Sequence, residues 1–185
     1  MISFNVVAST SEDTVVATYE PSKVRSDSYQ SEAELEKEFI RLLCEQGYTY
    51  LPLHTEDELI ANLRSQLEEL NHYQFSDTEW RQFFSDVIAN PNEHIPEKTR
   101  KIQDWEESKQ VLHRDDGSSK NITLIDKKNI HNNRLQVINQ YEVKQADGAR
   151  HDNRYDVTIL VNGFPLVHVE LKRRGVAIRE AFNQI

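Results

Sequence analysis

Two apolar segments joined by an Asn-Gly pair stand near the end of this sequence, where residues 155–172 read YDVTILVNGFPLVHVELK. The segments Tyr155 to Val161 and Phe164 to Lys172 are rich in β-branched and aromatic residues, which favour strands. An Asn-Gly pair between two such segments is a strong hairpin signal. The sequence therefore predicts two antiparallel strands that meet at Asn162 and Gly163.

Three charged residues interrupt this otherwise apolar hairpin, namely Asp156, Glu170 and Lys172. Side chains two apart on a strand share a face, so Glu170 and Lys172 point the same way. Burying them is costly without a partner, and a cation between Asp156 and Glu170 would offset that cost. Mg²⁺ favours a few carboxylates, a backbone carbonyl, waters and substrate phosphate. A metal-bound water with Lys172 beside it is the chemistry of phosphodiester hydrolysis.

The register of the hairpin decides whether Asp156 and Glu170 can share an ion. A two-residue turn pairs Asp156 with Val169 and places it on the opposite face from Glu170. A three-residue loop pairs Val161 with Pro165 and brings Asp156 opposite Glu170. A shared site therefore predicts the odd-length connection. The spacing alone leaves open an edge-strand salt bridge of Glu170 with Lys172 or Arg154, because single motif matches are weak.

Helices are predicted ahead of this hairpin. Ser31 and Glu34 form a capping box before a helix over residues 32–46, which Gly47 ends. Thr55 with Glu58, and Ser76 or Asp77, begin two more helices within a helical insertion at about residues 55–100. Cys44 lies near the apolar stripe of the first helix, so we expect it to be buried.

Strands dominate the sequence after residue 100. Residues 122–125 and 135–143 have the composition of strands, residues 145–153 that of a loop, and residues 178–184 begin a further helix. The first 30 residues are interpreted as an N-terminal arm or edge strand. The expected fold class is α/β (α+β), a sheet flanked by helices.

Charge is distributed unevenly along the 185 residues. Residues 1–97 carry 6 Lys and Arg against 19 Asp and Glu, whereas residues 98–185 carry 16 against 12. A polyanion would therefore meet the C-terminal half. The single cysteine, Cys44, gives no sign of an oxidising compartment, and no segment has the length of a membrane span or the features of a secretory signal. We expect a cytoplasmic protein without a membrane partner.

Asp156, then Glu170-x-Lys172, follows the signature of the PD-(D/E)xK nuclease superfamily, with Tyr155 in place of its proline. Residues 154–163, 170–175 and 179–185, together with 27–36 and 124–129, closely resemble the restriction (R) subunit of type I restriction-modification enzymes, type IC in particular. The resemblance spans roughly residues 27–185.

This resemblance implies an Mg²⁺-dependent endonuclease domain over residues 31–185, acting on double-stranded DNA. Its core would be a mixed sheet whose last part lies beyond the chain end. The ATP-driven motor domains would also follow there, and methyltransferase (M) and specificity (S) subunits would be partners.

The resemblance also implies roles for individual residues. Asp156, Glu170 and Lys172 would be catalytic, with Glu36 on the first helix and Gln184 of a Gln-x-x-x-Tyr element beside them. Asp156, Glu170 and the Leu171 carbonyl would bind the metal. His168 is weighed as a packing residue rather than a site residue. Candidates for DNA phosphate contacts are basic residues, namely Arg154, Arg173, Arg174, Arg179, Lys127 and Lys128.

An alternative of another class is a non-catalytic docking module. Its basic half would grip DNA or a partner subunit, and the acidic helices would bind the methyltransferase. Docking needs no carboxylate pair beside a lysine, so Asp156, Glu170 and Lys172 together favour the enzyme.

Overall fold

A computed structural model describes residues 3–9, 15–20, 31–104, 108–143 and 153–172 of the chain. The chain divides into two compact units, residues 1–30 and 31–185. The first unit holds an antiparallel pair, β1 (Ser3–Ser9) and β2 (Val15–Glu20), with an irregularity between Val6 and Ala8. The stretch expected to be an arm or edge strand thus contains its own hairpin.

A four-stranded sheet forms the centre of the second unit, in the order β3-β6-β7-β8. The strands are β3 (Thr49–Tyr50), β6 (Leu135–Val143), β7 (Asn153–Val161) and β8 (Phe164–Val169). β3 runs parallel to β6, and the other pairs are antiparallel. The fold is therefore an α/β arrangement with a mixed sheet, as predicted.

Three helices begin at the capping boxes found in the sequence. α1 (Glu32–Glu45), α2 (Glu56–Asn71) and α3 (Asp77–Phe83) follow Ser31, Thr55 and Ser76, whose side chains each accept a hydrogen bond from the third helical N–H. A π-helical turn (Phe84–Ile88) continues α3. The predicted starts of these helices are confirmed. Capping involves only residues that are close in the sequence, so the sequence alone can indicate it.

Several elements were not predicted from the sequence. These are α4 (Ile95–Gln103), the short β3, and β4 (Lys109–His113), which pairs with β5 (Ser119–Thr123). A short 3₁₀ helix covers Ile130–Asn132. The helix expected over residues 178–184 lies outside the described residues.

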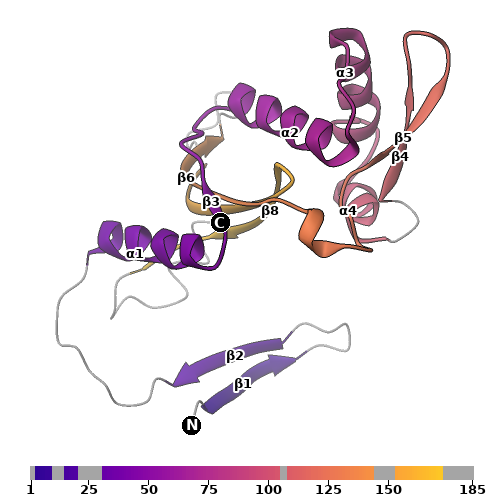
Figure 1. The fold of residues 1–185 in the computed structure, drawn as a ribbon. Coiled ribbons are helices and arrows are strands. Elements are labelled where there is room, and N and C mark those ends of the chain that lie inside the picture. Colours follow the sequence, from indigo (N-terminus) through magenta and orange to yellow (C-terminus); the bar gives the residue numbers. More distant parts are fainter. Residues whose placement is uncertain (1–2, 10–14, 21–30, 105–107, 144–152, 173–185) are drawn as a thin grey trace. The chain divides into compact units, whose positions relative to one another are not determined.

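Helices α1 and α2 lie on opposite sides of the sheet (Figure 1). On the α1 side, Leu43 packs with Val137 and Val157. On the α2 side, Asn62 and Gln136 exchange two side-chain hydrogen bonds of 3.1 Å. Cys44 is exposed, so the prediction that it is buried was wrong; the adjacent Leu43 fills the core position instead.

A second core joins α2 and α3 to the β4–β5 hairpin. Its buried members are mostly leucine and aromatic side chains, namely Leu63, Leu67, Phe75, Trp80, Phe83, Leu112, Ile122, Leu124 and Phe164. Phe164, the first residue of β8, belongs to this cluster. The helical insertion thus packs against the start of β8, and Glu170 directly follows the end of this strand.

The connection between β7 and β8 differs from the predicted one. Val161 pairs with Phe164, so the turn contains only Asn162 and Gly163, with φ values of 50° and 84°. Positive φ at both central residues is what a two-residue type I′ hairpin requires. The three-residue loop was therefore a wrong prediction.

A bulge in β8 restores the register that the turn would have lost. Leu160 pairs with Pro165, but Ile159 pairs with Val167, so Leu166 is an extra residue in β8. A bulge shifts all later pairs by one. Val157 consequently pairs with Val169, and the same register places Asp156 opposite Glu170.

Asn162 and Gly163 fasten the turn to the rest of the unit. The buried Asn162 side chain accepts from the Arg134 N–H at 2.8 Å and donates to the Leu124 carbonyl at 3.0 Å. A Cβ on Gly163 would stand 2.6 Å from the Leu63 Cα in α2. The turn therefore requires glycine both for its positive φ and for this close approach.

Comparing two alanine variants tests this close approach. Gly163→Ala and Gly117→Ala both force alanine into positive φ, but a Cβ added at Gly117 would meet no atom within 4 Å. We expect Gly117→Ala to lower the free energy of unfolding by about 1 kcal/mol. Gly163→Ala should cost about 3 kcal/mol or more, because helix backbone must move. Urea denaturation of both variants measures the difference, and equal losses would show that the approach to Leu63 is tolerant.

Candidate functional site

Asp156 lies on β7 and is held by the segment that follows β8. Its Oδ2 accepts a hydrogen bond of 2.8 Å from the backbone N–H of Leu171. Leu171 stands between Glu170 and Lys172, so this bond fastens the Asp156 carboxylate to the Glu-x-Lys segment. The three charged residues predicted from the sequence therefore come together at one end of the sheet.

Glu170 and Lys172 form an ion pair with 2.6 Å between Oε1 and Nζ. Only 11% and 19% of the Glu170 and Lys172 side-chain surfaces are exposed, so water screens the pair weakly. The hydrogen bond to Glu170 raises the pKa of Lys172, and the charges of Glu170, Glu32 and Asp156 add to the rise while burial opposes it. Lys172 therefore stays protonated at neutral pH.

Glu36 projects from α1 toward β6. Its carboxylate accepts a hydrogen bond of 2.5 Å from Asn139 Nδ2 and another from Gln140 Nε2. Its side chain is thus engaged with the sheet rather than with solvent alone. Neither Asn139 nor Gln140 was singled out from the sequence, although two adjacent amides within a predicted strand were a visible signal.

The residues at this site suit a cation that keeps much of its water. Within the described ranges, no group of three or more His, Cys, Asp or Glu side chains could hold a metal ion. Zinc and calcium cages need such groups. Mg²⁺ binds through one or two carboxylates with waters and substrate phosphate. Asp156 on β7 and Glu170, which directly follows β8 and precedes the Leu171 N–H that binds Asp156, fit that requirement.

His168 occupies a packing position near this site. Its Nδ1 lies 2.9 Å from Thr158 Oγ1, and its ring stacks on Tyr155 with 4.1 Å between centroids. These contacts account for the side chain without a role in chemistry. Gln184, Arg173, Arg174 and Arg179, and the side chain of Arg154, lie outside the described residues.

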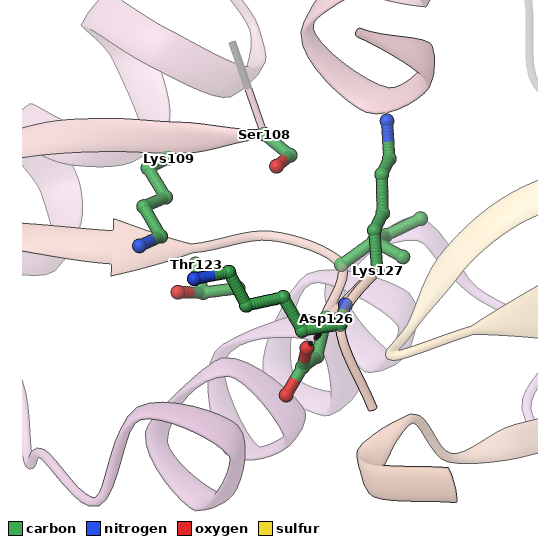
Figure 2. Close-up of a pocket in the computed structure, with 7 residues that line it drawn as sticks. Ser108, Lys109, Thr123, Asp126 and Lys127 are labelled. Atoms are coloured by element: carbon green, nitrogen blue, oxygen red, sulfur yellow. Dashed lines mark hydrogen bonds between the residues drawn. The ribbon is translucent and has the colours of Figure 1, made fainter. Parts of the chain in front are cut away.

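Lys127 and Lys128 line a cavity of about 540 Å³ between β4–β5 and the loop after β5. Figure 2 shows the Lys127 and Lys109 side chains, which both line this cavity, extending in different directions. The Lys127 nitrogen is buried and has no hydrogen-bond partner among the residues that the structure describes, whereas Lys128 is exposed. Asp126 Oδ1 accepts hydrogen bonds from the backbone N–H groups of Lys128 and Asn129. Of the two predicted phosphate contacts, only Lys128 presents its side chain to solvent.

Comparison with known proteins identifies the family to which this chain belongs. The family described as "Type I restriction enzyme R protein N terminus" matches residues 29–185. The chain belongs to this family, as its resemblance to R subunits implied.

The names of individual relatives agree with this family. The chain is 48% identical over 180 residues to the "Type I restriction enzyme EcoprrI endonuclease subunit" of Escherichia coli, which covers 97% of this chain and 56% of that protein. It is 38% identical over 162 residues to the SsaAORF53P endonuclease subunit of Staphylococcus saprophyticus, covering 85% of this chain and 16% of that protein. A Staphylococcus aureus subunit, SauMSSORF170P, is also 38% identical, over 163 residues. The chain thus spans about half, or far less, of its relatives' lengths.

A search of the helices in the described ranges finds none with the length and apolar character needed to cross a bilayer.

The effects of neighbouring charges on the pKa of Lys172 differ in size, and a titration experiment can test which is larger. Glu170→Gln should lower the pKa of Lys172 most, because it removes both a charged hydrogen-bond partner and the nearest negative charge. Glu32→Gln, the matched control, removes a charge that acts on Lys172 more weakly than Glu170 does, and should lower the Lys172 pKa less. NMR titration of the lysine side chains measures both shifts. An equal or larger fall in the Glu32 variant would contradict this order.

The raised pKa of Lys172 also predicts how the stability of the fold changes with pH. A lysine pKa raised by folding contributes stability below the ordinary lysine pKa, and this is lost as pH rises through the raised value. Glu170→Gln should therefore reduce the loss of stability between neutral and strongly alkaline pH. Urea denaturation of the wild type and the variant across this pH range measures the difference.

Proposed function

We propose that this chain is the endonuclease domain of a type I restriction enzyme and hydrolyses phosphodiester bonds of double-stranded DNA with Mg²⁺. The observation that carries the proposal is the meeting of Asp156, Glu170 and Lys172 at one end of the sheet. The hydrogen bond from Leu171 N–H to Asp156 and the Glu170–Lys172 ion pair support it. The family match and the names of the relatives agree with it.

In this proposal, the residues of the chain have the following roles. Asp156 and Glu170, and the Leu171 carbonyl, would hold the Mg²⁺. When bound, that ion would supply an acidified water and neutralise charge on the phosphate. Lys172, which is kept protonated by its neighbours, would stabilise the charge that develops at the reacting phosphate. The Leu171 N–H keeps the Asp156 carboxylate in place.

Partners and motor activity belong to the same proposal. M and S subunits would supply sequence recognition, and ATP-driven translocation would come from domains outside these 185 residues. A cytoplasmic location is proposed with them. Gln184, Arg173, Arg174 and Arg179 would act beside the site, and Arg154 on β7 would contact phosphate.

The rival docking module is less well supported. A docking surface gains nothing from a half-buried carboxylate pair beside a lysine, since burying charge costs free energy. The acidic faces of α2 and α3 are nevertheless a reasonable contact surface for another subunit. Both functions can therefore coexist in one domain.

Loss of the charged residues should separate cleavage from motor activity. In the complete enzyme, Asp156→Ala or Lys172→Ala should lower DNA cleavage by about 10²–10³-fold or more, because a preorganised charge at the reacting centre is lost. ATP hydrolysis and DNA association should remain. Plasmid nicking and linearisation, measured with ATPase rate on one preparation, give both readouts.

The matched control for this experiment is Asp116→Ala, which removes an exposed acid in the turn between β4 and β5, away from the acidic faces of α2 and α3. It should leave cleavage unchanged. Cleavage that survives either active-site substitution would make the charged cluster structural. An ATPase rate that falls with cleavage would mean that the site and the motor are coupled.

Two adjacent lysines provide a test of DNA contact. Lys128 is exposed, so Lys128→Ala should weaken DNA binding and reduce the slope of log K against log salt by about one. Lys127→Ala is the control, because its buried nitrogen does not reach solvent. Fluorescence anisotropy with duplex DNA over a salt series measures both slopes. An unchanged slope for Lys128→Ala would remove this loop from the DNA-binding surface.

A further inference from the structure

Gln140 has an unusual backbone for a residue in the middle of a strand. Its φ is +53°, although it is not glycine and lies within β6. Such a conformation costs about 1–3 kcal/mol and persists only where the surroundings enforce it. Residues held this way cluster at functional sites. The conformation therefore calls for an explanation beyond local strand geometry.

The contacts of Gln140 explain what its backbone achieves. Adjacent side chains on a strand normally point to opposite faces. Here Asn139 and Gln140 both donate hydrogen bonds to the Glu36 carboxylate on α1. The positive φ is what lets two consecutive residues reach one acceptor. Glu36 is thereby fixed by two donors from the same strand.

The two amides differ in what their oxygens do. Asn139 Oδ1 accepts a hydrogen bond of 2.8 Å from the Tyr50 hydroxyl. Gln140 Oε1 is buried and, in the described part of the chain, has no hydrogen-bond partner. Rotating the amide would not help, because an ionised carboxylate only accepts and needs Nε2. A buried acceptor without a protein partner costs about 1–3 kcal/mol and points to a water or ion as its partner.

The position of Gln140 links this oxygen to the charged cluster. Asn139 pairs with Val157 and Tyr141 with Tyr155, so Gln140 stands across from Asp156 in the register of β6 and β7. On α1, Glu32 acts electrostatically on Lys172, and Glu36 is one turn further along the same helix face. Both connections bring Gln140 and Glu36 to the end of the sheet where Asp156 lies.

We propose that Gln140 is a positioning residue of the nuclease site: its Nε2 orients Glu36, and its Oε1 would accept a hydrogen bond from water held at the Mg²⁺ site. The inference rests on the proposed function. It assigns Glu36 an indirect part, through Gln140 and water, which agrees with the absence of a three-acid cluster among the described residues. Residues that orient a metal's surroundings typically affect its affinity by about 10–100-fold.

Mg²⁺ binding to the 185-residue chain, measured by titration calorimetry, tests the proposal. Gln140→Met keeps the side-chain length but removes both the donor and the free acceptor. Its dissociation constant for Mg²⁺ should rise by roughly 10–100-fold. Thermal unfolding and circular dichroism of the same samples should show a folded protein. Wild-type affinity in folded Gln140→Met would overturn the proposal.

Asn139→Leu is the matched control, because it removes a donor to Glu36 without removing a free acceptor. It should raise the dissociation constant clearly less than Gln140→Met does. Equal effects would overturn the role of the Gln140 oxygen. Asp156→Ala distinguishes failure of the proposed function, since unchanged Mg²⁺ affinity in that variant would mean that the metal is not bound at Asp156 at all.

Discussion

The register of the β7–β8 hairpin is the constraint on which the site depends. A two-residue turn alone would leave Asp156 on the wrong face of the sheet from Glu170, because one residue of slip exchanges the faces. The extra residue Leu166 corrects that slip. The Asn162 side chain and the contact of Gly163 with α2 hold the turn in place. Packing far from the charged cluster thus sets its geometry.

The ion pair of the charged cluster contributes little to stability. A half-buried ion pair such as Glu170–Lys172 gains little over an apolar pair of similar size, because both charges must be desolvated. A carboxylate fastened by a backbone N–H and a lysine kept protonated are instead the groups that the proposed phosphodiester hydrolysis would use. The same reasoning applies to Gln140. Its strained backbone, and a side-chain oxygen that has no partner in the described part of the chain, lower stability unless a ligand compensates for them.

Local signals predicted the elements they control. Capping boxes at Ser31, Thr55 and Ser76 set the starts of three helices, because each involves residues only three apart. α4, which begins with Pro at its first turn, and the edge strand β4 carry weaker local signals and were missed. Cys44 was misplaced because sequence fixes the rotational phase of a helix poorly, and one residue separates it from the buried Leu43.

The sequence by itself determined that a hairpin would carry Asp156, Glu170 and Lys172, since strand composition and an Asn-Gly turn are local properties. It also contained the motifs by which the chain resembles R subunits. Tertiary structure alone decided the bulge at Leu166 and the attachment of Glu36 to Asn139 and Gln140. The reason is physical: a bulge and a positive φ cost free energy locally, and only contacts between residues distant in the chain make them favourable.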